Sequence, residues 1–381
     1  MLECSSMFEV ARKAPKKPPK LEKHGIINIR FGGRLDSFQI DKILADIHFI
    51  VTIYKSSCKE IRFICEGIFQ PKDMFVYVLF ETFIYTLRCK YNYNVSYAIS
   101  KAQSNVHIPG LSDSLLHYFY QADFDKNKME RDYNFLHNKH HFRRIISKDD
   151  IEGASKLLGE LKMFLKVFEI DQNYGLALAK VASELVDNAN EHAKSDCLID
   201  VYVSAPTYHK KNCNDGDYYS ISMVVVNFAD RTLNYGIQKK IENKNYEESM
   251  RYDLVERAFD NHKKYFKNKR YELGDFFNLA AFQDKISGRK METRTGGTGL
   301  TDLIKSLEDK AEEHICYVLS GNKGLRFEPE YLKYNADNWI GFNDSNDFVN
   351  EAPRLDLIVR SKVEFLGTGY NFVLIVKKEN E

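Results

Sequence analysis

The stretch from Glu184 to His192 places the tightest constraint on what this chain can fold into. Apolar residues recur through it and just before it at helical spacing: Leu178, Val181, Ala182, Leu185 and Ala189. This pattern predicts an amphipathic helix from about Tyr174 to His192. Because residues four apart on a helix lie one above the other, Glu184, Asn188 and His192 are expected to share one edge. Taken alone, a solvated polar face is the simpler interpretation.

The types of side chain on this edge also suit a metal–nucleotide site. A carboxylate such as Glu184 can orient or deprotonate a nucleophile, and the neutral amide oxygen of Asn188 is a hard ligand that suits Mg²⁺. A second motif lies about a hundred residues later, where Arg-Thr-Gly-Gly-Thr-Gly-Leu-Thr (294–301) runs into a helical pattern. Glycines let the backbone approach a ligand closely, and the free N–H groups of a helix start bind anions.

This order of motifs resembles the GHKL ATP-binding fold of DNA gyrase, MutL, the large heat-shock chaperone, sensor histidine kinases and anti-sigma-factor serine kinases. Residues 184–189 are similar to its N box, and residues 296–300 to its glycine-rich lid hinge. Gly367-Thr368, followed by the apolar run 372–376, is similar to its closing Gly-Thr strand. The resemblance covers residues 145–381. It implies an α/β (α+β) fold, in which helices form a two-layer sandwich with a mixed, mostly antiparallel sheet.

The sequence departs from the family where a strand predicted over residues 219–228 ends. The family has Asp-x-Gly-x-Gly there, and its aspartate accepts a hydrogen bond from the adenine amino group. This chain has Asn227-Phe228-Ala229-Asp230. Asn227 can still accept through its side-chain oxygen, and Asp230 is the competing candidate. The departure weakens the implied selectivity for adenine.

The resemblance implies that ATP binds with Mg²⁺ beneath a lid formed by residues 231–295. Glu184 is then the catalytic base and Asn188 the metal ligand. The implied nucleotide-binding residues are Asn188, Asn227, Asp230, Gly296, Gly297, Thr298, Gly299, Leu300 and Thr368.

Three functions remain open for such a site. The favoured one is an ATPase, a hydrolase that couples ATP hydrolysis to a conformational or assembly switch. The alternatives are a protein serine kinase of the anti-sigma type, acting on a STAS-like partner, and an ATP-gated adaptor that does not hydrolyse ATP.

The rest of the chain reads as a separate N-terminal part. The prolines and lysines of residues 1–24 predict a flexible basic arm. Residues 25–135 alternate strand and helix patterns in the order β-α-β-α-β and predict a small α/β domain, similar to STAS domains in element order alone. Its elements are expected at 26–31, 36–54, 60–65, 72–87 and 95–99. Residues 137–144, which contain three histidines, are predicted to be a basic surface junction, and residues 328–352 a polar insertion.

Composition narrows the cellular setting and the partners. The formal net charge is +1, so no overall field attracts a membrane, and nucleic acid is a disfavoured partner. The seven cysteines form no Cys-x-x-Cys pair, so neither a zinc site nor a disulfide framework is predicted, in keeping with a cytoplasmic protein. The apolar segment 74–87 is too short to cross a bilayer. A protein partner is expected, and a homodimer is an open alternative.

Overall fold

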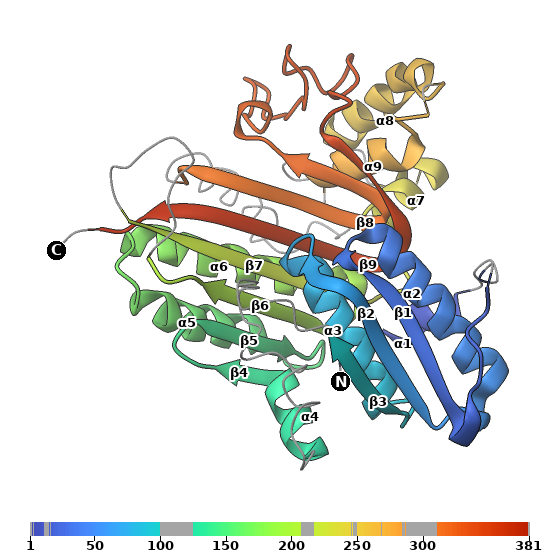
Figure 1. The fold of residues 1–381 in the computed structure, drawn as a ribbon. Helices are drawn as coiled ribbons and strands as arrows, with labels where there is room; N and C mark the ends of the chain where they lie inside the picture. The colour runs from blue at the N-terminus through green and yellow to red at the C-terminus, as the bar shows by residue number, and fades with distance from the viewer. Residues whose placement is uncertain are drawn as a thin grey trace.

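The chain forms an α/β structure in which one buried helix lies between two β-sheets (Figure 1). The coordinates are a computed structural model. It describes residues 2, 4–10, 15, 17–99, 125–206, 217–244, 246, 250–267, 269–283, 286 and 311–379. The first sheet has the parallel order β1-β2-β3, and the second has the order β4-β5-β6-β7-β9-β8. The sequence predicted a mixed, mostly antiparallel second sheet; every pairing between its described strands is antiparallel.

The N-terminal layer has the β-α-β-α-β order that the sequence predicts. Its elements are α1 (Ser5–Glu9), η1 (Lys23–Gly25), β1 (Ile26–Leu35), α2 (Ser37–Phe49), η2 (Ile50–Tyr54), η3 (Lys55–Ser57), β2 (Glu60–Pro71), α3 (Met74–Cys89) and β3 (Asn94–Ile99). Asp36 caps α2 as expected, since its carboxylate accepts from the N–H groups of Phe38 and Gln39.

The second part of the chain surrounds the antiparallel sheet with helices. Its elements are α4 (Lys126–Asn134), β4 (Phe135–His137), β5 (His141–Ile146), α5 (Gly153–Lys166), α6 (Gln172–Asn188), η6 (Ala189–Ala193), β6 (Cys197–Val203), β7 (Tyr218–Asn227), α7 (Tyr235–Asn243), α8 (Met250–His262), η7 (Lys263–Tyr265), α9 (Leu273–Ala281), β8 (Glu313–Phe327), η8 (Pro329–Tyr331) and β9 (Ile358–Lys377).

Both faces of the antiparallel sheet are buried, each against a different set of helices. Side chains alternate across a strand, and on β7 Met223 and Val225 pack in the cluster that contains α5 and α6. Val224 and Val226 pack instead with α3 and the N-terminal layer. Figure 1 shows α5 and α6 on one side of the sheet and α3 on the other. We refer to these as the α6 face and the α3 face.

Helix α3 is held at its N-terminus by both parts of the chain. Its own Asp73 accepts from Val76 N–H at 3.0 Å and also from the Tyr317 hydroxyl of β8 at 2.8 Å. The Phe75 N–H donates to Asn371 Oδ1 of β9 at 3.3 Å. Residues 74–87 are all buried, as the sequence predicts. The N-terminal layer and the antiparallel sheet therefore share one core.

Helix α1, which lies within the predicted flexible arm, is packed into the core. Met7 and Phe8 of α1 are fully buried, and the Phe8 ring meets Phe83 of α3 edge-on at 5.6 Å. The prediction of a flexible arm over residues 1–24 is wrong for α1, because two large apolar side chains there find a place in the core. The prediction was based on the prolines and lysines of the segment and did not take Met7 and Phe8 into account.

The predicted basic junction at residues 137–144 is also wrong, because β5 carries a buried ion cluster. Arg143 donates from Nη2 to Glu81 of α3 and from Nε to Asp200 of β6, each at 2.5 Å. His141 Nε2 lies 2.9 Å from the same aspartate. Burial alone would raise the pKa of Asp200, but Arg143 and His141 lower it to about 2. The charges face the α3 face of the sheet and not solvent.

The segment between β8 and β9, predicted to be a polar insertion, does lie between two strands, but it carries buried aromatic side chains that pack against α8. Trp339 and Phe348 are buried and stack with their ring centroids 5.3 Å apart. His262 of α8 bonds to the Phe348 carbonyl through Nε2 at 2.9 Å. Because a carbonyl only accepts, this nitrogen carries the proton, and burial lowers the pKa of His262 to about 4.

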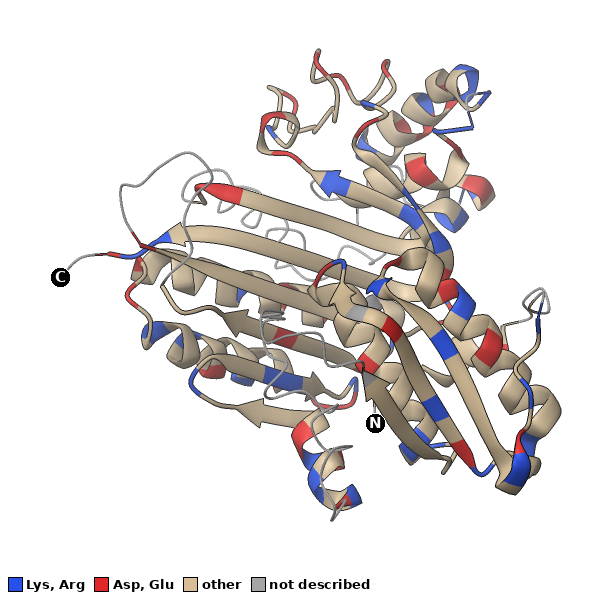
Figure 2. Cartoon of the chain, viewed as in Figure 1, with Lys and Arg blue, Asp and Glu red and all other residues tan. Residues whose placement is uncertain are grey.

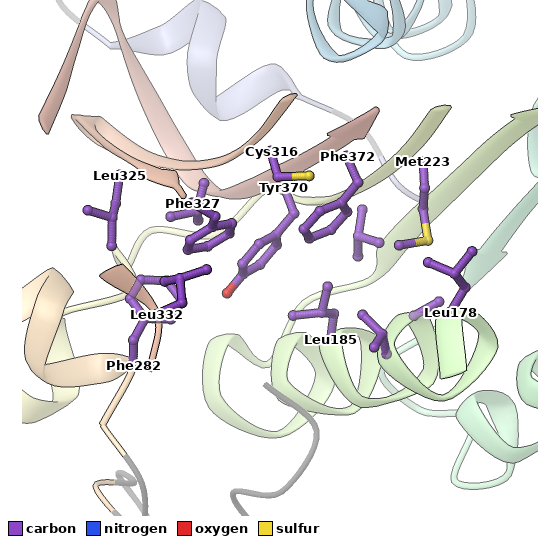
Figure 3. Packing of buried hydrophobic residues seen from close by; sticks show 14 of the residues in the cluster. Leu178, Leu185, Met223, Phe282, Cys316, Leu325, Phe327, Leu332, Tyr370 and Phe372 are labelled. Atoms are coloured by element: carbon purple, nitrogen blue, oxygen red, sulfur yellow. The ribbon is translucent and has the colours of Figure 1, made fainter. Parts of the chain in front are cut away.

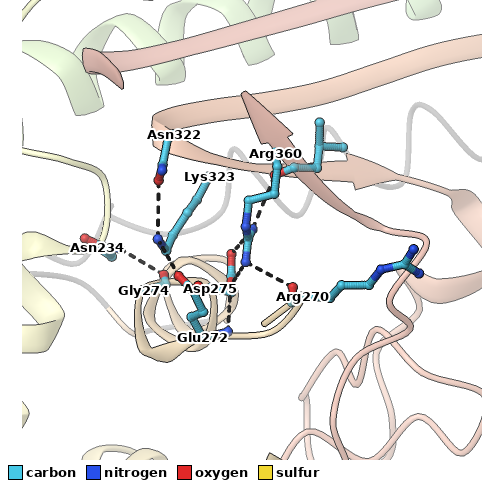
Figure 4. A network of polar contacts seen from close by, with 9 residues as sticks. Asn234, Arg270, Glu272, Gly274, Asp275, Asn322, Lys323 and Arg360 are labelled. Atoms are coloured by element: carbon cyan, nitrogen blue, oxygen red, sulfur yellow. Dashed lines mark hydrogen bonds and ion pairs between the residues drawn. The ribbon is translucent and has the colours of Figure 1, made fainter. Parts of the chain in front are cut away.

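Helix α9 and the residue that precedes it form ion pairs with β8 and β9. Arg360 of β9 donates to both carboxylate oxygens of Asp275, at 2.7 and 2.5 Å, and Lys323 of β8 pairs with Glu272 at 3.0 Å (Figure 4). Asn234, which precedes α7, donates to the Gly274 carbonyl at 2.9 Å. Helix α9 is thus tied to β8 and β9, and the residue that precedes α7 is tied to α9.

Surface charge of both signs is interspersed over the described helices and strand ends (Figure 2). Within the described chain, no helix combines the length and apolar character that a membrane crossing requires.

Candidate functional site

Residues 184–192, whose first part is similar to an N box, form the last turns of α6 and the turn that follows. Asp171 caps the helix by accepting from the Tyr174 N–H at 2.7 Å. Ser183 donates to the Ala154 carbonyl of α5 at 2.8 Å, so α5 lies on that side of α6. Each residue advances about 100° around a helix, which places Glu184 and Asn188 about 100° and 140° away from Ser183. Both are half-buried and lie on the flank of α6 turned away from α5.

The α-helix ends at Asn188 and not at His192 as predicted. Residues Ala189 to Ala193 form a π-helical turn, and Lys194 then adopts a left-handed conformation with φ of 50°. A π turn holds more residues than an α turn, so the four-residue spacing that relates Glu184 to Asn188 does not continue to His192. Such turns occur frequently at functional sites.

Three polar residues lie side by side where β7 ends. Asn227 of β7 is paired in register with Thr368 of β9, and Thr368 with Ser320 of β8. Two residues away along its own strand, each has a neighbour that packs on the α6 face: Val225 for Asn227, Tyr370 for Thr368 and Val318 for Ser320. All three therefore lie on the α6 face. We call Asn227, Thr368 and Ser320 the strand-end row.

Hydrogen bonds join the strand-end row to Ser195, which follows α6, and to Leu233, which lies between β7 and α7. Asn227 Oδ1 accepts from the Thr368 N–H at 2.7 Å, and its Nδ2 donates to Ser195 Oγ at 3.0 Å. Ser320 Oγ accepts from the Leu233 N–H at 2.8 Å and donates to the Gly367 carbonyl at 2.7 Å. The row is thus held in a fixed arrangement.

Gly367 is required by this arrangement. Its φ is +118°, and a Cβ atom there would run into the Asn227 carbonyl. Only glycine allows the backbone of β9 to approach β7 so closely in this conformation. The Gly-Thr pair noted in the sequence therefore has a physical role, because the glycine brings Thr368 beside Asn227.

An apolar floor continues from the row toward α6. Figure 3 shows Tyr370 and Phe372 pointing from β9 toward Leu185 of α6, with Leu332 beside the Tyr370 ring. Tyr370 follows Thr368 on the same face, and burial raises the pKa of its hydroxyl. These side chains are buried in the core that joins the sheet to α6: Tyr370 is 8% exposed and Phe372 is 0% exposed.

The other predicted site residues are placed as follows. Asp230 is exposed, three residues beyond the end of β7. The glycine-box residues Gly296, Gly297, Thr298, Gly299 and Leu300 lie outside the described residues. The sequence reasoning missed Ser195 and Ser320. Alternation along β8 places Ser320 on the same face as Cys316 and Val318.

The residues near the end of α6 fit a ligand that brings its own metal. No group of three or more His, Cys, Asp or Glu side chains suited to a metal occurs among the described residues. Asn188 can supply one neutral oxygen, and Asn190 Oδ1 in the π turn is buried without a hydrogen-bond partner. An unpaired buried acceptor is costly, and a cation or donor group of a ligand would satisfy it. These donors suit a metal that phosphate oxygens hold on its other side.

No protein-family model, curated protein or solved structure matches this chain.

Proposed function

We propose that the antiparallel sheet, α5 and α6 form a GHKL-type nucleotide-binding domain that binds ATP with Mg²⁺. One observation carries the proposal. The Thr368 N–H donates to Asn227 Oδ1 at 2.7 Å, although the two residues are 141 positions apart in the sequence. Both lie on the face of the sheet that α6 covers. The resemblance implied that these positions hold the adenine end of ATP. The apolar floor beside them suits a purine ring.

The residues at the end of α6 take the phosphate end of the ligand. Asn188 would hold Mg²⁺ through its amide oxygen, and the metal would supply charge neutralisation for the phosphates. Glu184, one turn earlier on the same flank, accepts the proton of the attacking hydroxyl. Phosphoryl transfer depends mainly on positioning and electrostatics, so few protein groups are needed.

We infer that the acceptor is water and that hydrolysis drives movement of the lid, since the lid root at Leu233 bonds directly to Ser320 of the row. Two hydrogen bonds, from Thr368 to Ser320 and from Leu233 to Ser320, thereby connect a ligand beside Thr368 to the segment that leads into α7. A protein serine acceptor and an adaptor without turnover are the competing outcomes of the same assay.

Titration calorimetry with a non-hydrolysable ATP analogue tests the proposal. We expect binding with Mg²⁺, and loss of that binding with EDTA or in Asn188→Ala. The matched control is Asn173→Ala, which removes an exposed amide from the first turn of the same helix and should bind as the wild type does. Folded protein that binds no analogue at millimolar concentration would overturn the proposal.

A further inference from the structure

The strand-end row has a fixed direction of hydrogen bonding, and Ser320 sets it. A serine hydroxyl has one hydrogen to donate and two lone pairs that accept. Ser320 is 3% exposed. Its hydrogen goes to the Gly367 carbonyl at 2.7 Å, because a carbonyl can only accept. One lone pair receives the Leu233 N–H at 2.8 Å, because a backbone N–H can only donate.

This arrangement determines the role of the Thr368 hydroxyl. Thr368 Oγ1 lies 3.4 Å from Ser320 Oγ. Ser320 has already given its only hydrogen to Gly367, so Thr368 must be the donor in this contact. Among the described residues, Thr368 Oγ1 has no other hydrogen-bond partner. Its lone pairs are therefore left to accept from a ligand, and its hydrogen is not.

The orientation of the Asn227 side-chain amide is also fixed by its hydrogen bonds. Its oxygen faces the Thr368 N–H, since the opposite orientation would set two donors against each other. Its nitrogen is turned toward Ser195, which precedes β6 on the other side of β7. The side of the row toward β9 therefore presents the Thr368 hydroxyl oxygen as an acceptor, beside the one lone pair of Asn227 Oδ1 that the Thr368 N–H does not use.

We propose that Ser320 is a positioning residue that holds the Thr368 hydroxyl as an acceptor, so that the site selects a base carrying an exocyclic amino group over one carrying a carbonyl. This inference rests on the proposed nucleotide site. An amino group donates to both acceptor oxygens. A 6-oxo group would set its own lone pairs against them and leave the Thr368 hydroxyl oxygen without a donor. The row thus restores selectivity for adenine although Asn227 stands where the family has aspartate.

ADP and inosine diphosphate test the inference, because they differ at the purine 6-position, which is amino in one and oxo in the other. Calorimetry with Mg²⁺ should show that the wild type prefers ADP by roughly 10- to 100-fold, the range expected when a buried polar group loses its partner. In Ser320→Ala the Thr368 hydroxyl is free to rotate and donate. The preference should then fall to within about 3-fold, mainly because inosine diphosphate binds more tightly.

Two further variants separate this role from a general structural one. Ser222→Ala removes a buried serine from the opposite face of the same sheet and should leave the preference unchanged. Thr368→Val keeps the side-chain shape and the N–H that Asn227 accepts, so it should lose the preference even if Ser320→Ala does not fold.

Each outcome decides a distinct point. Equal binding of the two diphosphates by the wild type would overturn the role of Ser320 while leaving a nucleotide site in place. A full preference for ADP in Ser320→Ala or Thr368→Val would do the same. Absence of binding by either nucleotide would overturn the proposed function itself, and this inference with it.

Discussion

The two faces of the antiparallel sheet are built from the same strands but carry different polar groups. On the α3 face, Arg143 lies between Glu81 and Asp200, and all three are fully buried. Their charges are paired within the protein. On the α6 face, Asn227 Oδ1 already accepts from the Thr368 N–H, whereas the Thr368 hydroxyl oxygen accepts from none of the described residues. The comparison separates an interface that closes the core from a platform suited to a ligand.

Strand β9 takes part in both faces within four residues. Thr368 belongs to the row on the α6 face, while Asn371 caps α3 on the other side. Between them, Gly369 lies so close to the Phe75 ring of α3 that a Cβ atom would clash. The N-terminal layer is therefore a structural backing for the strand that carries the site.

Glu184→Gln should have the largest effect, and this effect should be on turnover at the α6 face alone. The change keeps size but removes the base, so turnover should fall by ~10²–10⁴-fold. Nucleotide affinity should stay within a few-fold, since the row and Asn188 remain. Phosphate release and calorimetry measure the two effects. Normal turnover in this variant would mean that the carboxylate is structural, and phosphate appearing only on a partner's serine would favour the kinase.

Arg143→Leu tests whether the α3 face depends on its buried charges. It leaves Glu81 and Asp200 buried without their shared cation, and should lower the free energy of unfolding by about 3–5 kcal/mol. The neighbouring Arg144 lies in a half-exposed pair with Glu160, and Arg144→Leu should cost at most about 1 kcal/mol. Urea unfolding measures both. Equal losses from the two substitutions would contradict the distinction between the faces.

Acid should act on the same cluster through Asp200. Its folded pKa of about 2 lies below the ordinary 3.8, so its ionised form stabilises the fold above pH 4, and this stability is lost as the pH falls from about 4 to 2. The difference in unfolding free energy between wild type and Asp200→Asn should therefore shrink by about 2 kcal/mol between pH 5 and pH 2. A difference that does not change with pH would show that Asp200 is not held ionised by its partners.

Asn227→Ala should have the smallest effect, weakening adenine nucleotide binding by about 1–2 kcal/mol through loss of one hydrogen-bond partner. Asp230→Ala, three residues further on and exposed, is the control and should bind normally. If Asp230→Ala weakens binding and Asn227→Ala does not, the base lies beyond the end of β7 and not at the row.

Elements with strong periodicity could be predicted from the sequence. The five strands and helices of the N-terminal layer and the helix through Glu184 and Asn188 follow from apolar spacing. Pairings between distant residues could not be predicted. Arg143 reads as a surface charge because its partner Glu81 lies 62 positions away, and nothing local marks the contact.

The site was partly predictable for the same reason. Glu184, Asn188 and the Gly-Thr pair stand out as local motifs, whereas Ser320 gains its role only when β8 lies beside β9. The π turn after Asn188 has no local signal, since Ala189 to Ala193 continues a helical pattern of residue types.

Hydrogen–deuterium exchange with and without ATP and Mg²⁺ tests the difference between the faces most directly. Peptides that cover residues 186–195, 225–234 and 364–370 should exchange more slowly when nucleotide is bound, because they carry the end of α6, the end of β7 and the Gly-Thr pair. Peptides from α3 and β1 should be unchanged. Protection confined to α3 and β1, with none at the row, would contradict the assignment of the α6 face as the nucleotide site.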